Sequence, residues 1–223
     1  MKLINKNLMP TYNRLPISFE KGEGVWVFDK ANNKYLDALS GIAVNTLGHN
    51  HPSLVKAISN QVVKFIHISN YYYIEEQSIL ADKLVKLSGL SSVFFCNSGC
   101  EANEAAIKLA RLHGHKLNID TPNIIVMEGG FHGRTMGTLS ASGGRNYQAG
   151  FEPLMSGYIR VPFDDVDAIE KVASKKNKVC AIFLEPIQGE GGINIPKNLK
   201  QYLKKLRQIC DQNKWLLIFD EVQ

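Results

Sequence analysis

Apolar residues form short unbroken runs in the second half of the chain, and these runs predict strands. The segment from Val179 to Leu184 is apolar at every position, as is the segment from Trp215 to Phe219. Runs of about four to eight such residues are typical of strands buried on both faces of a sheet. Less continuous runs predict three further strands, at residues 92–96, 123–128 and 157–163.

The segments between these strands have the apolar spacing or the composition of helices. An alanine-rich helix is predicted at residues 101–113, a short helix from Asp164 or Asp165, and a longer helix at residues 199–212. A glycine-rich loop opens the segment 129–142 and leads into another helix. Apolar strands that alternate with helices predict an α/β fold, with a mostly parallel sheet covered by helices on both faces.

The N-terminal part of the chain has a different pattern. Residues 24–29 and 34–41 flank the turn residues Asn32 and Asn33, which predicts a β-hairpin. A helix is predicted to begin at Pro52, because proline suits the first helical turn and apolar residues follow at helical spacing. A second helix is predicted at residues 75–87.

Composition and charge restrict the class of protein. With 223 residues, 44% of them apolar and 21% charged, the chain is predicted to fold around a core of its own. A net charge of +5, with both signs interspersed, argues against a nucleic-acid partner and favours a small molecule. No apolar stretch approaches the roughly 18 to 20 residues of a membrane span, and no signal peptide is recognised. The four cysteines lack a Cys-x-x-Cys pair, which favours reduced thiols in the cytoplasm.

Four polar phrases fall at the ends of predicted strands, where parallel sheets bind ligands. In the first, Ser98, Gly99 and Cys100 would present backbone N–H groups at a helix N-terminus, which suits a phosphate. An ordinary strand-to-helix turn capped by Ser98 fits the same residues. The phrases are NSGCE from Asn97, EGGFHGR from Glu128, EPIQGEGG from Glu185 and DEVQ from Asp220.

The other phrases carry side chains suited to an organic ligand. Phe131 could stack on a planar ring and Arg134 could clamp a carboxylate, although a core phenylalanine and a surface arginine are the ordinary interpretation. Glu185 and Glu190 lie in a turn shaped by proline and glycine, and turn chemistry does not explain a glutamate directly after an apolar strand. Asp220 ends another apolar strand, where burial is costly unless a cation pairs with it. A protonated ring nitrogen or Mg²⁺ would supply that cation.

The Mg²⁺ alternative predicts a nucleotide-binding protein. LLIFDE at residues 216–221 is similar to the Walker B strand of a P-loop-like ATPase. That class requires a Gly-x-x-x-x-Gly-Lys-Ser/Thr loop, which the chain lacks, so the ATPase is a distant alternative. Zinc is also disfavoured, because His49 and His51 lie in one loop and Cys96 and Cys100 are split between a strand and a turn.

Five sequence blocks in their order resemble the class-III aminotransferases, which depend on pyridoxal 5'-phosphate (PLP). The blocks are SGIAVNTLGHNHP, FFCNSGCEANEAAIKLAR, FHGRTMGTLS, EPIQGEGG and FDEVQ. The resemblance covers nearly the whole chain but only the first part of the family's length, so the chain is expected to be truncated. It implies the fold type I of PLP-dependent transferases. Residues 71–223 would form the first part of the large PLP-binding domain, and residues 1–70 would belong to a smaller domain and to dimer contacts.

The resemblance implies where the cofactor would bind. Ser98, Gly99 and Cys100 would hold its phosphate; the family usually has threonine or alanine in place of Cys100, and a backbone contact survives that change. Phe131 and Val222 would lie on opposite faces of the pyridine ring. Asp220 would pair with the ring nitrogen and keep it protonated. Gln223 would reach the phenolic oxygen of the ring, and Glu185 would lie beside the cofactor.

The resemblance also implies how substrates would bind. Arg134 would hold the substrate α-carboxylate, and Glu190 would be a gate that pairs with an arginine until a dicarboxylate arrives. Gly41 stands where ornithine δ-aminotransferases have a tyrosine that contacts the free α-amino group, and a glycine leaves room for an acylated amine. The implied reaction is amino transfer from N-acetylornithine to 2-oxoglutarate, which yields glutamate. Ornithine and succinyl-diaminopimelate are alternative substrates.

The catalytic lysine of the family is not matched in this sequence. In the family, the lysine that holds the cofactor as a Schiff base lies beyond the FDEVQ block, and Lys214 precedes the last strand and does not match it. The 223 residues alone are therefore expected to be inactive, while the complete enzyme would be a homodimer. The alternative is a non-catalytic remnant that binds at most the cofactor phosphate or a partner subunit.

Overall fold

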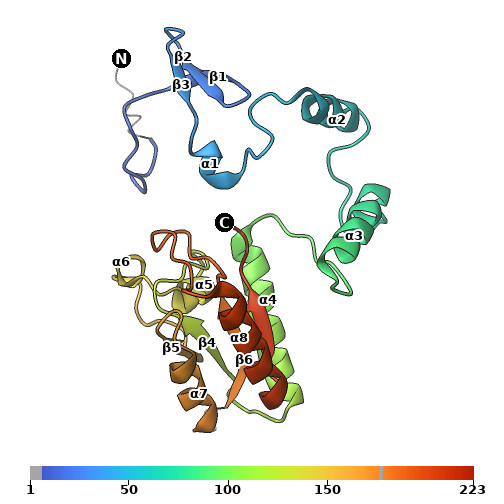
Figure 1. The fold of residues 1–223 in the computed structure, drawn as a ribbon. Helices are drawn as coiled ribbons and strands as arrows, with labels where there is room; N and C mark the ends of the chain where they lie inside the picture. Colours follow the sequence, from blue (N-terminus) through green and yellow to red (C-terminus); the bar gives the residue numbers. More distant parts are fainter. Residues whose placement is uncertain (1–6, 176–177) are drawn as a thin grey trace. The chain divides into compact units, whose positions relative to one another are not determined.

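The computed structural model describes residues 7–175 and 178–223 of the chain. It divides into two compact units, Met1–Lys83 and Leu84–Gln223 (Figure 1). The division reflects packing within this chain, so the expected boundary between residues 70 and 71 stays a prediction. All the strand-end phrases lie in the second unit.

The first unit begins with a small antiparallel sheet. The predicted hairpin is confirmed, and its turn is stabilised by Asp29, whose Oδ1 accepts the N–H groups of Ala31 and Asn33, both at 2.9 Å. A third strand was not predicted, because its sequence FEKGE has no apolar alternation. The strands, in the order β1-β2-β3, are β1 (Phe19–Glu23), β2 (Trp26–Asp29) and β3 (Lys34–Leu36).

Three helical segments follow. The predicted helices are confirmed as α2 (Pro52–Val62) and α3 (Glu75–Ser88), the latter extending across the boundary between the units. The short α1 (Ser40–Ala43) was not predicted, and it is not a regular right-handed helix. Gly41 and Ile42 have φ angles of 65° and 61°, in the left-handed region.

The second unit contains a parallel sheet in the order β5-β4-β6-β7. Four of the five predicted strands are confirmed: β4 (Asn123–Met127), β5 (Tyr158–Val161), β6 (Val179–Leu184) and β7 (Leu216–Phe219). The prediction of a strand at residues 92–96 is wrong. This segment pairs with no strand of the described residues and Phe94 is 70% exposed, so its backbone has no ladder to join.

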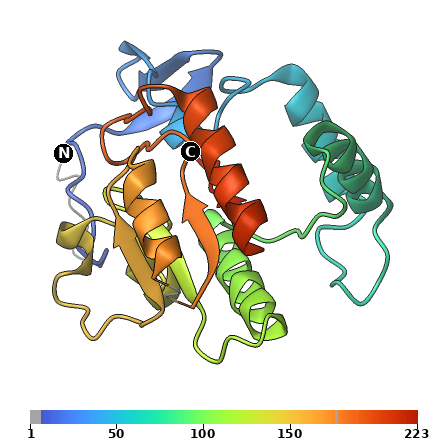
Figure 2. The same cartoon turned by 60° about the horizontal axis from the view of Figure 1, so that its bottom comes forward.

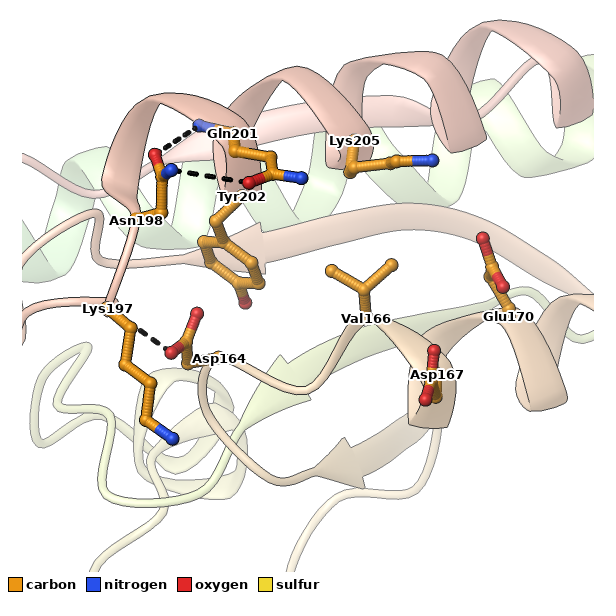
Figure 3. Close-up of a pocket in the computed structure, with 9 residues that line it drawn as sticks. All are labelled: Asp164, Val166, Asp167, Glu170, Lys197, Asn198, Gln201, Tyr202 and Lys205. Atoms are coloured by element: carbon orange, nitrogen blue, oxygen red, sulfur yellow. Dashed lines mark hydrogen bonds between the residues drawn. The ribbon is translucent and has the colours of Figure 1, made fainter.

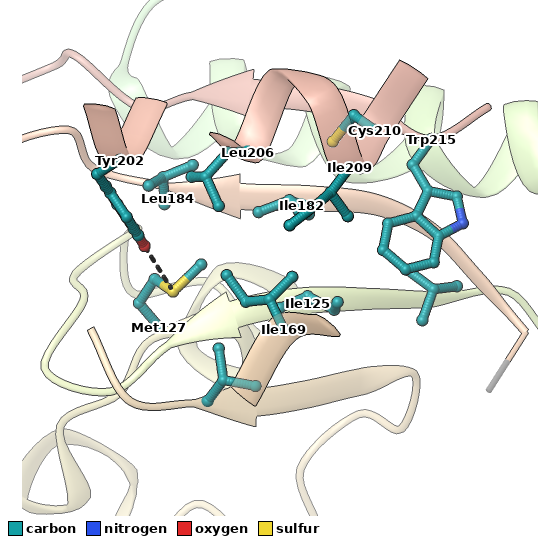
Figure 4. Close-up of a cluster of buried hydrophobic side chains, with 12 residues drawn as sticks. Ile125, Met127, Ile169, Ile182, Leu184, Tyr202, Leu206, Ile209, Cys210 and Trp215 are labelled. Atoms are coloured by element: carbon teal, nitrogen blue, oxygen red, sulfur yellow. Dashed lines mark hydrogen bonds between the residues drawn. The ribbon is translucent and has the colours of Figure 1, made fainter. Parts of the chain in front are cut away.

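Helices cover both faces of this sheet, as predicted (Figure 2). On one face, Ile124 and Val126 pack with Ile107 of α4. On the other face, Ile125 and Met127 pack in a cluster with Leu206 of α8 (Figure 4). The helices are α4 (Gly99–Lys116), α5 (Met136–Ala141), α6 (Arg145–Gln148), α7 (Val166–Ser174) and α8 (Leu199–Asn213).

The strand order places a crevice at the carboxyl ends of the strands. The chain leaves β4 to form β5 on one side and then returns to form β6 on the other. At such a switch point the loops after neighbouring strands diverge and leave room for a ligand. Across residues 7–175 and 178–223, no helix combines the length and the apolar character needed to cross a membrane.

Candidate functional site

A cavity of about 250 Å³ lies where the start of α4, the loop after β4 and the chain after β7 meet. The structure brings every expected site residue to this cavity except Glu185 and Glu190. The expected residues that line it are Ser98, Gly99, Cys100, Phe131, Arg134, Asp220, Val222 and Gln223.

The N-terminus of α4 forms one end of the cavity. Ser98 is its N-cap in extended conformation, and the Ser98 Oγ accepts the N–H of Glu101 at 3.2 Å. Gly99 and Cys100 lie in the first turn, where a helix supplies no carbonyl partner for the backbone N–H groups. The cap and the anion site are therefore compatible, and this end of the 18-residue helix favours a negative charge.

Cys100 also holds the glycine-rich loop after β4. Its Sγ accepts the N–H of Arg134 at 3.4 Å. A Cβ on Gly133 would lie 2.6 Å from this sulfur, and the φ angle of Gly133 is +131°, so the loop approaches α4 closely only with glycine there. The side chain that departs from the family's usual residue thus helps to position Arg134 at the cavity.

Asp220 supplies a buried carboxylate at the carboxyl end of β7, where it is 7% exposed. Its Oδ2 accepts hydrogen bonds from Asn103 Nδ2 at 2.8 Å and from His132 Nδ1 at 2.9 Å, and its Oδ1 accepts the N–H of Val222 at 3.1 Å. Burial acts to raise the pKa of Asp220, whereas the hydrogen bonds from His132, Val222 and Asn103 act to lower it, and this pKa lies below its ordinary value. The cavity therefore contains an ionised acid that suits a cationic partner.

Sequence reasoning missed Asn103 and gave His132 no role, although both line the cavity. Asn103 lies on the buried face of α4 with Ile107 and Ala110. A polar residue in this otherwise apolar stripe was the available signal, because buried amides need partners. His132 gave only a weak signal as an imidazole in a glycine-rich loop.

Glu185 and Glu190 lie outside the residues that line the cavity. Glu185 is 3% exposed, and its carboxylate accepts the N–H groups of Phe131 at 2.8 Å and of Gly189 at 3.3 Å. Burial raises the pKa of Glu185. The exposed Glu190 accepts a hydrogen bond from the hydroxyl of Tyr147, whose ring meets Phe131 edge to face. Their expected roles toward cofactor and substrate stay predictions.

The lining residues form a site that favours a negative charge at one end and a positive charge at the other. The helix N-terminus at Ser98 suits a phosphate, and Asp220 suits a protonated nitrogen, with the Phe131 side chain also on the wall. Asp220 Oδ1 holds only one N–H among the described residues, so it has room for another donor. An anionic, aromatic and cationic ligand such as PLP fits this set. In the part of the chain that the structure describes, no three His, Cys, Asp or Glu side chains gather as a metal site.

Comparison with known proteins identifies the family. The model of the family "Aminotransferase class-III" matches residues 8–223. The chain belongs to the class-III aminotransferases. The resemblance seen in the five sequence blocks is thereby confirmed, and the cofactor of this class-III aminotransferase chain is PLP.

Relatives and solved structures agree with this assignment. The chain is 61% identical over 217 residues to an acetylornithine aminotransferase of Nitrosomonas europaea, covering 97% of this chain and 55% of the relative. It is similar to the structure of N-acetylornithine aminotransferase from Stenotrophomonas maltophilia, with a TM-score of 0.78, 36% identity and coverage of 93% and 51% of the two chains. For the ornithine aminotransferase from Toxoplasma gondii the TM-score is 0.89, with 30% identity and coverage of 96% and 50%. The expected fold type I is confirmed, and the chain spans about half the length of the curated relatives it matches.

Another cavity of this class-III chain, of about 350 Å³, lies beside α7 and α8 (Figure 3). Its side chains are mostly charged, and it contains none of the expected site residues. Two hydrogen bonds here hold the start of α8: Asp164 accepts the N–H of Lys197 at 3.0 Å, and Asn198 caps the helix by accepting the N–H of Gln201 at 3.1 Å. We assign no chemistry to it.

Proposed function

We propose that the protein that carries this chain is an acetylornithine aminotransferase of arginine biosynthesis. It would transfer the amino group of N2-acetyl-L-ornithine to 2-oxoglutarate and form N-acetyl-glutamate 5-semialdehyde and glutamate. The observation that carries the proposal is the 61% identity to the acetylornithine aminotransferase of Nitrosomonas europaea over 97% of this chain. The relatives from Bordetella pertussis and Clostridium acetobutylicum bear the same functional name, at 50% and 51% identity.

The lining residues have distinct roles in this proposal. Backbone N–H groups at Ser98, Gly99 and Cys100 hold the cofactor phosphate, which agrees with their position at the start of α4. When bound, PLP supplies an electron-accepting ring. Asp220 holds the proton on the ring nitrogen, which suits its buried and ionised carboxylate.

The remaining lining residues orient the ring and the substrate. Phe131 and Val222 lie on its two faces, and Gln223 reaches its phenolic oxygen. Arg134 binds the α-carboxylate of the substrate with its planar guanidinium group. These roles are supported by the position of all four side chains on one cavity.

Gly41 supports the choice of an acylated substrate. In the proposed enzyme, a glycine at this position leaves space where a tyrosine would contact a free α-amino group. N-acetylornithine is therefore preferred to ornithine, and succinyl-diaminopimelate presents a similar acylated end. Glu190 acts as the gate for the second carboxylate of 2-oxoglutarate.

The test is a substrate comparison with the full-length protein that carries this chain. Production of glutamate from 2-oxoglutarate is measured with N-acetylornithine, ornithine and N-succinyl-diaminopimelate as amino donors. The proposal expects the highest kcat/KM with N-acetylornithine. A higher kcat/KM with ornithine, or no glutamate from any of the three donors, would contradict it.

We also propose a homodimer in the cytoplasm, with neither nucleic acid nor a membrane as partner. All four cysteines are free thiols, which agrees with a reducing compartment. Light scattering of the full-length protein would give its oligomeric state, and a monomeric mass would contradict the dimer.

A further inference from the structure

His132 belongs to a buried hydrogen-bond network in the wall of the cavity. Its side chain is fully buried, and its Nδ1 lies 2.9 Å from Asp220 Oδ2. The backbone N–H of His132 donates to Ser142 Oγ at 2.9 Å, and its ring stacks on Phe183 with centroids 4.0 Å apart. The imidazole is thus held by Asp220 and by Phe183, and the backbone of the same residue is held by Ser142.

The surroundings of the ring determine where its proton lies. Nδ1 faces a carboxylate oxygen and must donate to it. Nε2 is buried and has no hydrogen-bond partner among the described residues. A proton on Nε2 as well would bury a positive charge and an N–H without an acceptor, which is costlier than a bare nitrogen. The geometry therefore selects the Nδ1–H tautomer with a bare Nε2.

This tautomer determines what Asp220 offers to the cavity. His132 donates a hydrogen bond without bringing a positive charge, so the carboxylate keeps its own charge for a cation. Oδ2 is occupied by His132 and Asn103, whereas Oδ1 holds only the N–H of Val222. Since a carboxylate oxygen has two lone pairs, Oδ1 is the atom that can accept a further donor.

We propose that His132 is a positioning residue that fixes Asp220 through its Nδ1–H, so that the carboxylate presents Oδ1 to the ring nitrogen of the cofactor. The inference rests on the proposed role of Asp220. It assigns to the loop after β4 a second function besides the stacking residue Phe131. The competing role for His132 is packing alone, through the stack on Phe183.

Two substitutions separate these roles because they remove opposite halves of the side chain. In His132→Asn, the amide nitrogen occupies the place of Nδ1, since both are bonded to Cγ, and the ring stack is lost. In His132→Phe, the ring remains to stack on Phe183 and the donor is lost. A positioning role and a packing role therefore predict opposite orders for the two variants.

The measurement is the binding of pyridoxamine 5'-phosphate (PMP) to the full-length apoprotein, followed by absorbance. PMP has no aldehyde, so it binds without a covalent bond to a lysine. We expect His132→Asn to stay within about threefold of the wild-type Kd, and His132→Phe to raise Kd about tenfold or more, because a hydrogen bond to a charged group is lost. The absorption band of bound PMP should also change in His132→Phe only. The reverse order, or two unchanged affinities, would overturn the inference.

A second measurement needs no variant. A neutron structure of the wild-type apoprotein should show deuterium on Nδ1 of His132 and none on Nε2, and deuterium on Nε2 would overturn the inference. The control for folding is the circular-dichroism melting curve of each variant. If the wild-type protein failed to bind PMP, the proposed function would fail together with this inference. If it bound PMP and the two variants did not differ from it, only the inference about His132 would fail.

Discussion

The side chain of Val222 packs directly against the α-carbon of Gly99, where the chain after β7 meets the first residue of α4. A Cβ on Gly99 would lie 2.8 Å from Val222 Cγ1 and 3.0 Å from Cγ2. The first distance is shorter than Cβ contacts in proteins, and the second is tighter than nearly all of them, so a side chain on Gly99 would force Val222 to shift. The contact joins the phosphate end of the cavity to the segment that carries Asp220.

The first prediction concerns this contact. Gly99→Ala should lower the free energy of unfolding by about 1 to 3 kcal/mol, because the added methyl group overpacks a close approach. It should also weaken PMP binding, since it displaces the start of α4 or the Val222 segment. Urea unfolding and PMP titration measure the two effects.

Removal of the opposing methyl groups is the matched control. The double variant Gly99→Ala, Val222→Ala should recover part of the stability lost in Gly99→Ala, and the two substitutions should be non-additive. Strict additivity would show that the two residues do not contact each other.

The second prediction concerns Asp220 and pH. Its pKa is lowered below 3.8 in the folded protein, so between the two values the folded state binds fewer protons than the unfolded state. The stability that the ionised Asp220 contributes is present above its ordinary pKa and is lost as the pH falls through the lower, folded value. The free energy of unfolding of the apoprotein should therefore fall in this acid range, and it should fall less steeply in Asp220→Asn.

Asp167 is the control for this pH dependence, because it is exposed on α7. Asp167→Asn should leave the acid slope of the wild type unchanged. Equal slopes for the wild type and Asp220→Asn would contradict the low pKa of Asp220.

The third prediction tests whether Glu185 stabilises the fold or contacts the cofactor. Glu185→Ala leaves the partly buried N–H groups of Phe131 and Gly189 without their acceptor, and each group that stays unsatisfied costs about 1 to 3 kcal/mol. The variant should be destabilised by at least about 1 kcal/mol in urea unfolding, whereas the exposed Glu170→Ala should be nearly neutral. Wild-type stability in Glu185→Ala, together with a loss of PMP binding, would instead favour direct contact with the cofactor.

The fourth prediction concerns the end of α8. Lys214 caps this helix with φ 59° and ψ 32°, a left-handed conformation that costs a residue other than glycine about 1 to 2 kcal/mol. Lys214→Gly should raise the free energy of unfolding by roughly 0.5 to 1 kcal/mol, because glycine's extra entropy cost is smaller than this strain. Lys204→Gly, inside the same helix, should lower it by about 1 kcal/mol. If thermal or urea unfolding showed that both variants change the free energy of unfolding in the same direction, the capping role would be contradicted.

The strands could be predicted where both faces of the sheet are covered. In β4, Ile124 and Ile125 point to opposite clusters, so every position after Asn123 is apolar and the run is visible in the sequence. The segment 92–96 is just as apolar, yet it has no neighbouring strand among the described residues. Apolar character indicates burial or contact. A strand also needs backbone hydrogen bonds to a second segment, which lies far away in the sequence.

In the candidate site, too, residues could be predicted from their sequence neighbours, whereas residues whose partners are distant in the chain could not. Asp220 was predictable because a polar residue stands out at the end of an apolar strand, and Ser98 because small residues precede an alanine-rich helix. Asn103 was missed because its partner Asp220 lies 117 positions away, and His132 lies 88 positions from the same acid. The family resemblance implies that Glu185 lies beside the cofactor, and this stays a prediction. The partners of Glu185 are backbone N–H groups, which no side-chain pattern in the sequence reveals.

The last prediction concerns Arg134, which lines the cavity with Phe131 and Cys100. If its guanidinium binds the substrate carboxylate in two parallel hydrogen bonds, lysine cannot replace it, because a single ammonium group lacks that fork. In the full-length protein, Arg134→Lys should raise KM for N-acetylornithine and for 2-oxoglutarate by about tenfold. PMP carries no carboxylate, so its Kd should stay near the wild-type value. Asp220→Asn, in contrast to Arg134→Lys, should raise the Kd for PMP. A variant Arg134→Lys that loses PMP affinity and keeps both KM values would place the guanidinium on the cofactor and not on the substrate.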